Sequence, residues 1–267
     1  MNINTLKRIN LKKGRLNISS LEINKVILGD CVEIMKTFPD KCIDLIFADP
    51  PYFGNQSNLI IKRNDDHPIG FFNTGKAKWA FSKSLQFQFE FTRSWLQECK
   101  RILKEGATIW VTGTYHSIGV INVVLQDLGF KILNDIILYK LNAPPNFTGS
   151  CFRACTETML WAKKSPKGKT KFYYWRMKKL NKGRQMSNVW MYKAKSYPFR
   201  HPATKQECIL ERVILASSEK GDIVLDPFGG SGTTAVVAKR LKRNYIIIEK
   251  DPNYYQLILD RLAGKYG

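Results

Sequence analysis

The stretch VLDPFGGSGTTAVVAKRLKRNYIIIEKD, residues 224–251, decides the fold of this chain. Its apolar start predicts a strand that ends at Asp226, and three glycines between residues 229 and 232 allow a tight turn into a helix that begins at about Thr233. The run NYIIIE predicts the next strand, which ends in Glu249 about 20 residues after the glycines. This arrangement suits a nucleoside cofactor, because backbone amides at a helix N-terminus approach the ligand and the acid binds ribose hydroxyls. A glycine turn of this kind can also be purely structural.

The spacing of the glycines narrows the choice of cofactor. It is neither GxGxxG, which would favour NAD, nor GxxxxGK[ST], the Walker phosphate loop. S-adenosylmethionine carries an amino acid where those ligands carry phosphates, so it needs no pyrophosphate cradle. The glycine stretch is therefore compatible with S-adenosylmethionine.

A second stretch, DLIFADPPYF, runs from Asp44 to Phe53. Its apolar run predicts a buried parallel strand, which must stop at the two prolines because proline cannot donate to a sheet ladder. The rigid turn then holds Asp49 and Tyr52 at the mouth of the sheet. The alternative interpretation is a plain strand end with a capping Asp. Asp30, before the helical pattern CVEIMKTF, can likewise be a plain N-cap.

The rest of the chain alternates strand and helix patterns, which predicts an α/β fold. Its 267 residues, 44% of them hydrophobic, suffice for one large core. We divide the chain into a basic tail at residues 1–20, mobile or a DNA-backbone arm, and a single catalytic domain at 21–267. That domain contains a long loop at 54–83 and an insertion at 163–200. Six cysteines without a CxxC pair indicate reduced thiols in the cytoplasm, and no pattern predicts a metal site or a membrane span.

A net charge of +21 predicts a polyanionic partner, either nucleic acid or an acidic membrane face. The insertion at 163–200 favours nucleic acid, since no acidic residue occurs between Glu157 and Glu207 and aromatic residues are interleaved with the basic ones. Lysines bind phosphate there, whereas arginine and amide side chains are shaped for base edges. The predicted DNA-binding residues are Lys171, Arg176, Lys178, Lys179, Arg184, Gln185 and Asn188.

The motifs ADPPYF and DPFGGSGTT together resemble those of the DNA amino-methyltransferases, which methylate adenine N6 or cytosine N4. The catalytic motif comes first, as in the circularly permuted β class, and the resemblance covers most of residues 24–263. It is strongest to the group of the HinfI and cell-cycle-regulated GANTC adenine methyltransferases, whose additional C-terminal domain we expect this chain to lack. The resemblance implies a Rossmann-like S-adenosylmethionine-dependent methyltransferase fold. Its sheet would be mostly parallel and seven-stranded, with helices on both faces.

The resemblance also assigns roles to individual residues. The implied catalytic residues are Asp49, Pro50, Pro51 and Tyr52. The implied cofactor-binding residues are Asp30, Asp49, Lys205, Asp226, Phe228, Gly230, Ser231, Gly232, Thr233 and Glu249. Lys205 belongs, with His201 and Pro202, to a helix-entry motif near the methionine carboxylate of the cofactor. The chain departs from the family at Gln206, where a proline is usual.

The chemistry of an exocyclic amine explains the catalytic motif. The nitrogen is a poor nucleophile because its lone pair is delocalised into the base. The Asp49 carboxylate and the Pro50 carbonyl can each accept one N–H, and a preorganised turn keeps both acceptors in place. Tyr52 can stack on the base, which must be flipped out of the duplex. No Pro-Cys pair is present, which argues against methylation of cytosine C5 by a cysteine nucleophile.

We therefore expect a site-specific enzyme that methylates adenine N6 in duplex DNA, in a restriction-modification system or as an orphan. Methylation of cytosine N4 is the nearest alternative. A non-catalytic nucleic-acid-binding module on a decayed fold, or an RNA substrate, are the others. The expected partners are double-stranded DNA, a second subunit in a homodimer and a cognate restriction endonuclease. The expected location is the bacterial cytoplasm, at the nucleoid.

Overall fold

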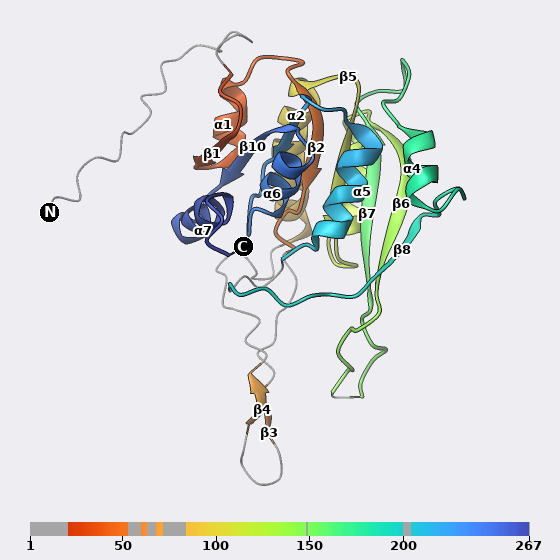
Figure 1. The fold of residues 1–267 in the computed structure, drawn as a ribbon, viewed down its shortest axis with the longest axis vertical. Coiled ribbons are helices and arrows are strands. Elements are labelled where there is room, and N and C mark those ends of the chain that lie inside the picture. Colours follow the sequence, from red (N-terminus) through yellow and green to blue (C-terminus); the bar gives the residue numbers. More distant parts are fainter. Residues whose placement is uncertain are drawn as a thin grey trace, which may run out of the picture.

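The computed structural model describes residues 21–52, 60–62, 68–71, 84–147, 149–199 and 204–266. Within these residues one sheet has eight strands in the order β1-β10-β9-β2-β5-β7-β6-β8 (Figure 1). These strands are β1 (Lys25–Leu28), β2 (Ile43–Ala48), β5 (Leu103–Gly113), β6 (Lys131–Lys140), β7 (Thr156–Lys163), β8 (Val189–Tyr192), β9 (Ile223–Asp226) and β10 (Asn244–Glu249). A separate antiparallel pair consists of β3 (Ile60–Lys62) and β4 (Pro68–Phe71).

The sheet is parallel except for β7, which runs antiparallel to both of its neighbours, β5 and β6. The carboxyl ends of the other seven strands therefore share one edge, which we call the carboxyl edge, at the bottom of Figure 1. The opposite edge is the amino edge. A mostly parallel sheet was expected and is confirmed, but the expected seven strands are one too few. The eighth, β8, lies inside the predicted insertion and pairs with β6 as an edge strand.

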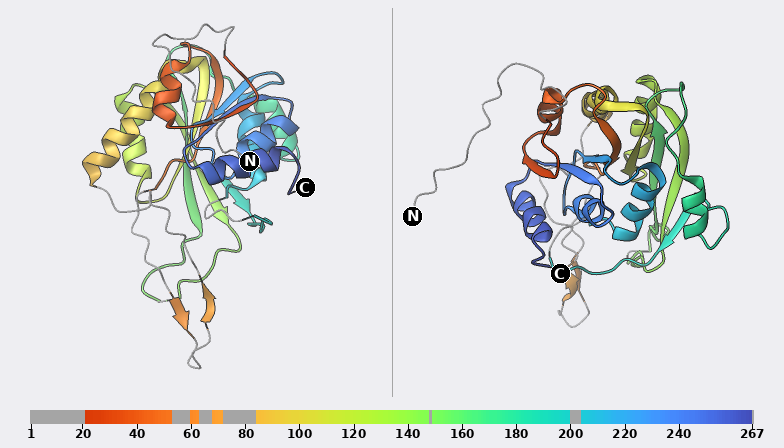
Figure 2. Two further views of the ribbon diagram at one scale, coloured as in Figure 1. Left: turned by 90° about the vertical axis from the view of Figure 1, so that its left-hand side faces the viewer. Right: turned by 45° about the horizontal axis from the view of Figure 1, so that its top comes forward.

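Helices cover both faces of the sheet, as predicted (Figure 2). One face carries α1 (Cys31–Thr37), α2 (Leu85–Ile102) and α3 (Ile118–Asp127), and the other carries α4 (Tyr174–Leu180), α5 (Glu207–Ser217), α6 (Thr233–Arg240) and α7 (Pro252–Leu262). Side chains of β2 alternate between the two cores: Ile46 packs with α2, whereas Phe47 packs with α5. Both residues are fully buried, so β2 lies at the centre of the fold and its carboxyl end is held rigidly.

Local sequence signals set the helix starts near the carboxyl edge. Asp30 caps α1 by accepting a hydrogen bond from the Val32 amide, and Asp251 caps α7 by accepting one from Asn253. Pro252 follows Asp251 at the first turn of α7, as predicted. These caps place α1 and α7 directly after β1 and β10, beside the loop that follows β9.

The predicted insertion does not form a separate unit. After β7 the chain runs along the amino edge, forms α4 against α5, and returns as β8. The predicted basic tail at 1–20 and most of the predicted loop at 54–83 lie outside the described residues. In the part of the chain that is described, no helix has the length and apolar character needed to cross a membrane.

Candidate active site

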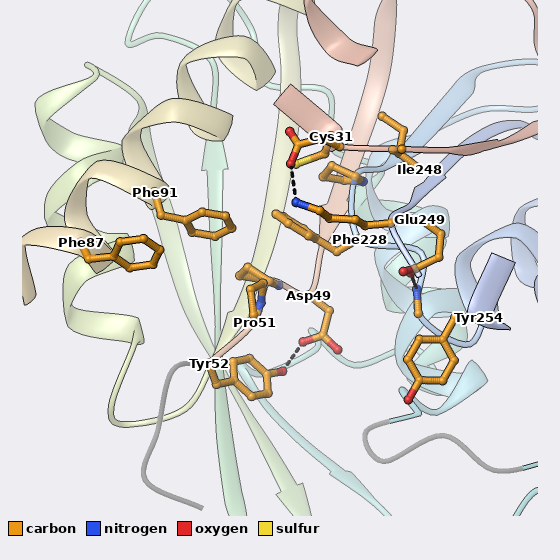
Figure 3. A pocket seen from close by; sticks show the side chains of 16 residues that line it. Cys31, Asp49, Pro51, Tyr52, Phe87, Phe91, Phe228, Ile248, Glu249 and Tyr254 are labelled. Carbon is orange, nitrogen blue, oxygen red and sulfur yellow. Dashed lines mark hydrogen bonds and ion pairs between the residues drawn. The ribbon is translucent and has the colours of Figure 1, made fainter. Parts of the chain in front are cut away.

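A pocket of about 340 Å³ opens at the carboxyl edge, between the ends of β1, β2, β9 and β10 and the first turns of α2 (Figure 3). It joins the two sequence motifs, which are separated by about 180 residues of chain: Asp49 stands on one side and Gly230 on the other. Eight of the predicted site residues line it, namely Asp30, Asp49, Pro50, Pro51, Tyr52, Phe228, Gly230 and Glu249. The remaining predicted cofactor residues lie behind it.

The glycine loop is built by close packing behind the pocket. Gly232 has a φ of +79°, and a Cβ atom at this position would lie 2.8 Å from Ile258. The loop residues Ser231 and Thr233 contact each other through their hydroxyls at 3.2 Å, and Arg261 donates to the Ser231 carbonyl at 2.6 Å. The predicted cofactor residues Ser231, Gly232 and Thr233 therefore shape the loop and do not line the pocket.

Asp226 has a similar supporting place. It is buried beneath the loop, where it accepts hydrogen bonds from the Phe228 amide and the Thr234 hydroxyl. Burial raises the pKa of Asp226 to about 8, against the opposing effect of these two donors. The carboxyl group of Asp226 thus fixes the start of the turn from within the protein.

Two acids face the far side of the pocket. Glu249 accepts the Gly230 amide at 2.6 Å on one oxygen and the Asp251 amide at 2.8 Å on the other. Asp30 caps α1 and also lines the pocket, and Lys250 lies 3.1 Å from its second oxygen. Its contact with the cofactor stays a prediction. An ionised carboxylate accepts about four hydrogen bonds, so Glu249 keeps capacity for ligand hydroxyls.

Aromatic rings form the wall between these two sides. Phe228 packs edge-on against the buried Trp95, with ring centroids 5.2 Å apart, and at 6.3 Å from Phe91. Phe87, Phe91 and Tyr254 also line the pocket and were not predicted as site residues. Phe87 and Phe91 are four residues apart on α2, which is the spacing of one helical face. This four-residue spacing of two phenylalanines, in the helix that follows the catalytic motif in the chain, was the sequence signal that could have predicted them.

The Asp49 carboxylate is held asymmetrically. Its Oδ1 atom accepts hydrogen bonds from the hydroxyls of Tyr52 and Thr112, and the Lys205 ammonium lies 3.1 Å from the same oxygen. Its Oδ2 atom has no contact of this kind with the described residues, and Figure 3 shows it directed away from Tyr52. Burial, reinforced by Asp49, raises the pKa of Tyr52 well above its ordinary value, so the phenol remains a donor.

Lys205 does not line the pocket. It was expected near the carboxylate of the cofactor, yet it is absent from the pocket lining and its ammonium contacts Tyr52 at 2.6 Å and Glu157 at 3.1 Å in addition to Asp49. The neighbouring His201 and Pro202 lie outside the described residues. Lys205 therefore lies behind Asp49. We call the group of Asp49, Tyr52, Thr112 and Lys205 the catalytic corner.

Two of the predicted DNA-binding residues make contacts within the protein at the amino edge. Lys171 forms ion pairs with Asp44 and Asp222 at the amino edge, and Arg176 donates to the carbonyls of Leu215 and Ser218 at the end of α5. Both side chains thus join structural elements on the side of the sheet opposite the pocket. One-signed charge in a sequence does not tell which edge of a sheet it will reach.

The other predicted DNA-binding residues lie on α4 or in the loop between α4 and β8, at the outer end of the sheet. Lys178 stands over the Trp175 ring at 5.2 Å, and Asn188 donates to the Asp135 carbonyl. The side chains of Lys179, Arg184 and Gln185 are exposed. None of these residues lines the pocket, and their contact with DNA stays a prediction.

Comparison with known proteins decides the family. The model of a family described as DNA methylase, covering N6 and N4 methyltransferases, matches residues 43–260. The chain belongs to this DNA methylase family. It is 42% identical over 250 residues to the type II methyltransferase M.HinfI of Haemophilus influenzae, covering 90% of this chain and 68% of that protein. It is 40% identical over 249 residues to the type II methyltransferase M2.DpnII of Streptococcus pneumoniae, covering 91% of each.

The fold has a counterpart among solved structures. The crystal structure of an M1.HpyAVI–SAM complex matches with a TM-score of 0.62 and 24% identity, over 89% of this chain and 98% of that one. The predicted methyltransferase fold and the relation to amino-methyltransferases are thereby confirmed. That other structure contains S-adenosylmethionine. The pocket suits this donor, because it offers acids and a backbone amide for a nucleoside, aromatic walls, and a carboxylate for the sulfonium charge.

Proposed function

We propose that this DNA methyltransferase transfers a methyl group to N6 of an adenine flipped out of duplex DNA. The observation that carries the proposal is the asymmetric hold on Asp49, which fixes Oδ1 and leaves Oδ2 beside the pocket without a partner among the described residues. An acceptor in that position can take one N–H of the target amine. The Pro50 carbonyl on the same turn can take the other.

These two acceptors would prepare the nitrogen for attack. Holding both N–H bonds draws the amine toward a tetrahedral geometry, so that its lone pair points at the methyl group to be transferred. The methyl donor supplies an electrophilic carbon on a positively charged sulfur. The Tyr52 and Thr112 hydroxyls donate to Asp49 and keep its carboxylate oriented. The buried Tyr52 remains protonated across the physiological pH range. The Asp49 carboxylate, which holds one N–H of the amine, can accept the proton that the methylated amine releases.

For the cofactor we assign the nucleoside end to the side of the pocket formed by Gly230, Asp30 and Glu249. Glu249 would accept the ribose hydroxyls, and Phe228 would pack against the adenine. Asp226, Ser231, Gly232 and Thr233 would keep the loop in shape from behind. This assignment places the sulfonium toward Asp49, at the side of the pocket where the target amine enters.

For DNA we propose a basic surface at the carboxyl edge. Exposed Arg153 lies in the segment between β6 and β7, and exposed Lys193 and Lys195 follow β8, so all three come from segments that meet at this edge. Phe152, beside Arg153, is 98% exposed. Cations at this edge would bind backbone phosphates around the pocket and give affinity without sequence information.

Product analysis tests the proposed target. The protein is incubated with unmodified duplex DNA and labelled S-adenosylmethionine, and the DNA is digested to nucleosides and separated. We expect the label in N6-methyl-2′-deoxyadenosine, and none with the Asp49→Ala variant. Label in N4-methyl-2′-deoxycytidine would replace adenine by the nearest alternative. DNA binding by the wild type without any transfer would support the non-catalytic alternative, and transfer to RNA alone would identify RNA as the substrate.

Dimerisation, a cognate restriction endonuclease and a cytoplasmic, nucleoid-associated location stay predictions. A second subunit enlarges the surface with which a small enzyme binds DNA, which is the physical reason to expect a homodimer. Sedimentation with and without duplex DNA would measure it.

A further inference from the structure

Glu157 has no role in the sequence motifs, yet it stands beside the catalytic corner. It is the second residue of β7, and its Oε1 atom lies 3.1 Å from the Lys205 ammonium. On the other side, Lys205 lies 3.1 Å from Asp49 Oδ1 and donates to the Tyr52 hydroxyl. One ammonium group therefore stands between two carboxylates, Asp49 and Glu157.

The surroundings of this group make the arrangement costly to disturb. The Lys205 side chain is only 9% exposed, and the side chains of Asp49 and Glu157 are 16% and 25% exposed. Burial opposes the charged form of Lys205, but the two acids outweigh it and raise the pKa of Lys205 well above its ordinary value. The ammonium is thus a permanent charge, and its position depends on the balance between its two partners.

The sheet fixes that balance geometrically. Asp49 follows β2, Thr112 is the last residue but one of β5 and Glu157 is the second residue of β7, and these three strands are neighbours in the sheet. Lys205 reaches them from the segment before α5. Glu157 and Lys205 line a second pocket of about 450 Å³, whereas Asp49 and Tyr52 line the cofactor pocket. Glu157 does not line the cofactor pocket, and its ion pair with Lys205 connects it to Asp49.

We propose that Glu157 is a positioning residue for methyl transfer, which draws the Lys205 ammonium to the Oδ1 side of Asp49 and so keeps Oδ2 free for the target amine. This inference rests on the proposed function of Asp49. Without the charge of Glu157, Lys205 has one carboxylate partner. It would then move onto Asp49, bridge both oxygens and compete with the amine for Oδ2.

Three variants test this: Glu157→Gln, Glu157→Asp and Lys205→Met, together with the double variant Glu157→Gln/Lys205→Met. Single-turnover transfer is measured at saturating DNA, and the Kd for S-adenosylmethionine is measured by calorimetry. We expect Glu157→Gln to lower the transfer rate by about 10²-fold, the scale of a misplaced reacting group, with cofactor Kd unchanged within twofold. The charged but shorter Asp should retain more activity than the isosteric Gln.

The double variant separates positioning from an independent contribution. Because Glu157 acts through Lys205, adding Glu157→Gln to Lys205→Met should change the rate by less than twofold. Glu105→Gln is the matched control, since Glu105 pairs with the buried Lys164 at 3.4 Å on the amino edge, and it should leave the rate unchanged.

Three results would overturn the inference: a wild-type rate for Glu157→Gln, additive losses in the double variant, or Gln more active than Asp. Should Glu157→Gln fail to fold, the transfer rate of Glu157→Asp relative to wild type decides. We expect a lower transfer rate with an unchanged cofactor Kd, and an unchanged transfer rate would contradict the inference. A wild-type protein that transfers no methyl to duplex DNA would instead refute the proposed function itself.

Discussion

Asp44 and Asp49 stand at opposite ends of β2, and the protein binds their carboxylates in different ways. At the amino edge, Asp44 uses both oxygens: Oδ2 accepts from Lys104 at 2.8 Å and from the Ile223 amide at 3.0 Å, and Lys171 lies 3.3 Å from Oδ1. At the carboxyl edge, Asp49 receives its donors on Oδ1 and has none on Oδ2 among the described residues.

The difference separates a structural acid from a reactive one. Burial would raise the pKa of Asp44, but the Lys104 and Ile223 bonds and the Lys171 charge outweigh it and lower that pKa. Asp44 thus stabilises the start of β2 with its hydrogen-bonding capacity used within the protein. Asp49 is held just as firmly, yet half of its capacity faces a pocket. We infer that a rigid, incompletely bonded carboxylate marks the catalytic end of the strand.

The largest effect should come from removing each acid in turn. Asp49→Ala should lower single-turnover methyl transfer by about 10³-fold or more, since it removes a preorganised transition-state contact, while cofactor binding stays mostly intact. Asp44→Ala should leave the rate near wild type but lower the free energy of unfolding by about 1–3 kcal/mol, because buried donors lose their acceptor. Loss of cofactor binding in Asp49→Ala would show that Asp49 has another role.

The next effect concerns the loop opposite Asp49. Gly232 and Gly221 have similar φ values, +79° and +85°, but only Gly232 lies in the cofactor loop, and a Cβ atom at Gly221 would meet nothing within 4 Å. Each Ala substitution carries a comparable backbone strain of about 1 kcal/mol. Gly232→Ala should weaken S-adenosylmethionine binding by about 10-fold, about 1.4 kcal/mol. Gly221→Ala should bind as wild type, and equal Kd values in the two variants would contradict the proposed role of the loop.

A smaller effect compares basic residues at the two edges. Arg153→Ala should weaken duplex binding several-fold and reduce the slope of log K against log salt by about 1, as expected for one phosphate contact. Lys171→Met should leave that slope unchanged, because Lys171 pairs with Asp44 and Asp222 at the amino edge. A reduced slope in Lys171→Met alone would place the DNA surface at the amino edge instead.

A separate effect is a pH dependence of stability at Asp226. Its folded-state pKa of about 8 lies above the unfolded value of about 3.9. Between these values the folded state holds a proton that the unfolded state has released, so wild-type stability should fall as pH rises from 5 to 8. Asp226→Asn removes this titration. Urea unfolding at pH 5, 6.5 and 8 should show that the free energy of unfolding of Asp226→Asn rises relative to that of the wild type as the pH rises. A difference that does not change with pH would contradict this prediction.

The two motifs could be predicted from the sequence because each is local. Apolar runs, a glycine turn and two prolines fix the ends of β2 and β9, and parallel strands bring those ends to one edge, where Asp49 and Gly230 share a pocket. The caps at Asp30 and Asp251 are local signals of the same kind.

What could not be predicted depends on distant contacts. Glu157 and Lys205 are 48 residues apart and Lys205 is 153 residues from Tyr52, so no spacing rule links them. The strand β8 has four residues among basic ones, and it is recognisable only through its pairing with β6. The basic residues of the insertion divide between edges for the same reason: charge indicates a partner, and the fold decides which charges face it.

One structure tests the central claim most directly: the protein with S-adenosylhomocysteine and a duplex that contains the methylation site. The measured quantity is the distance from the target nitrogen to each Asp49 oxygen. We predict about 2.7–3.2 Å to Oδ2, a hydrogen-bond distance, with Lys205 remaining between Oδ1 and Glu157. A target amine bonded elsewhere, or a Lys205 ammonium occupying Oδ2 in the complex, would contradict the account.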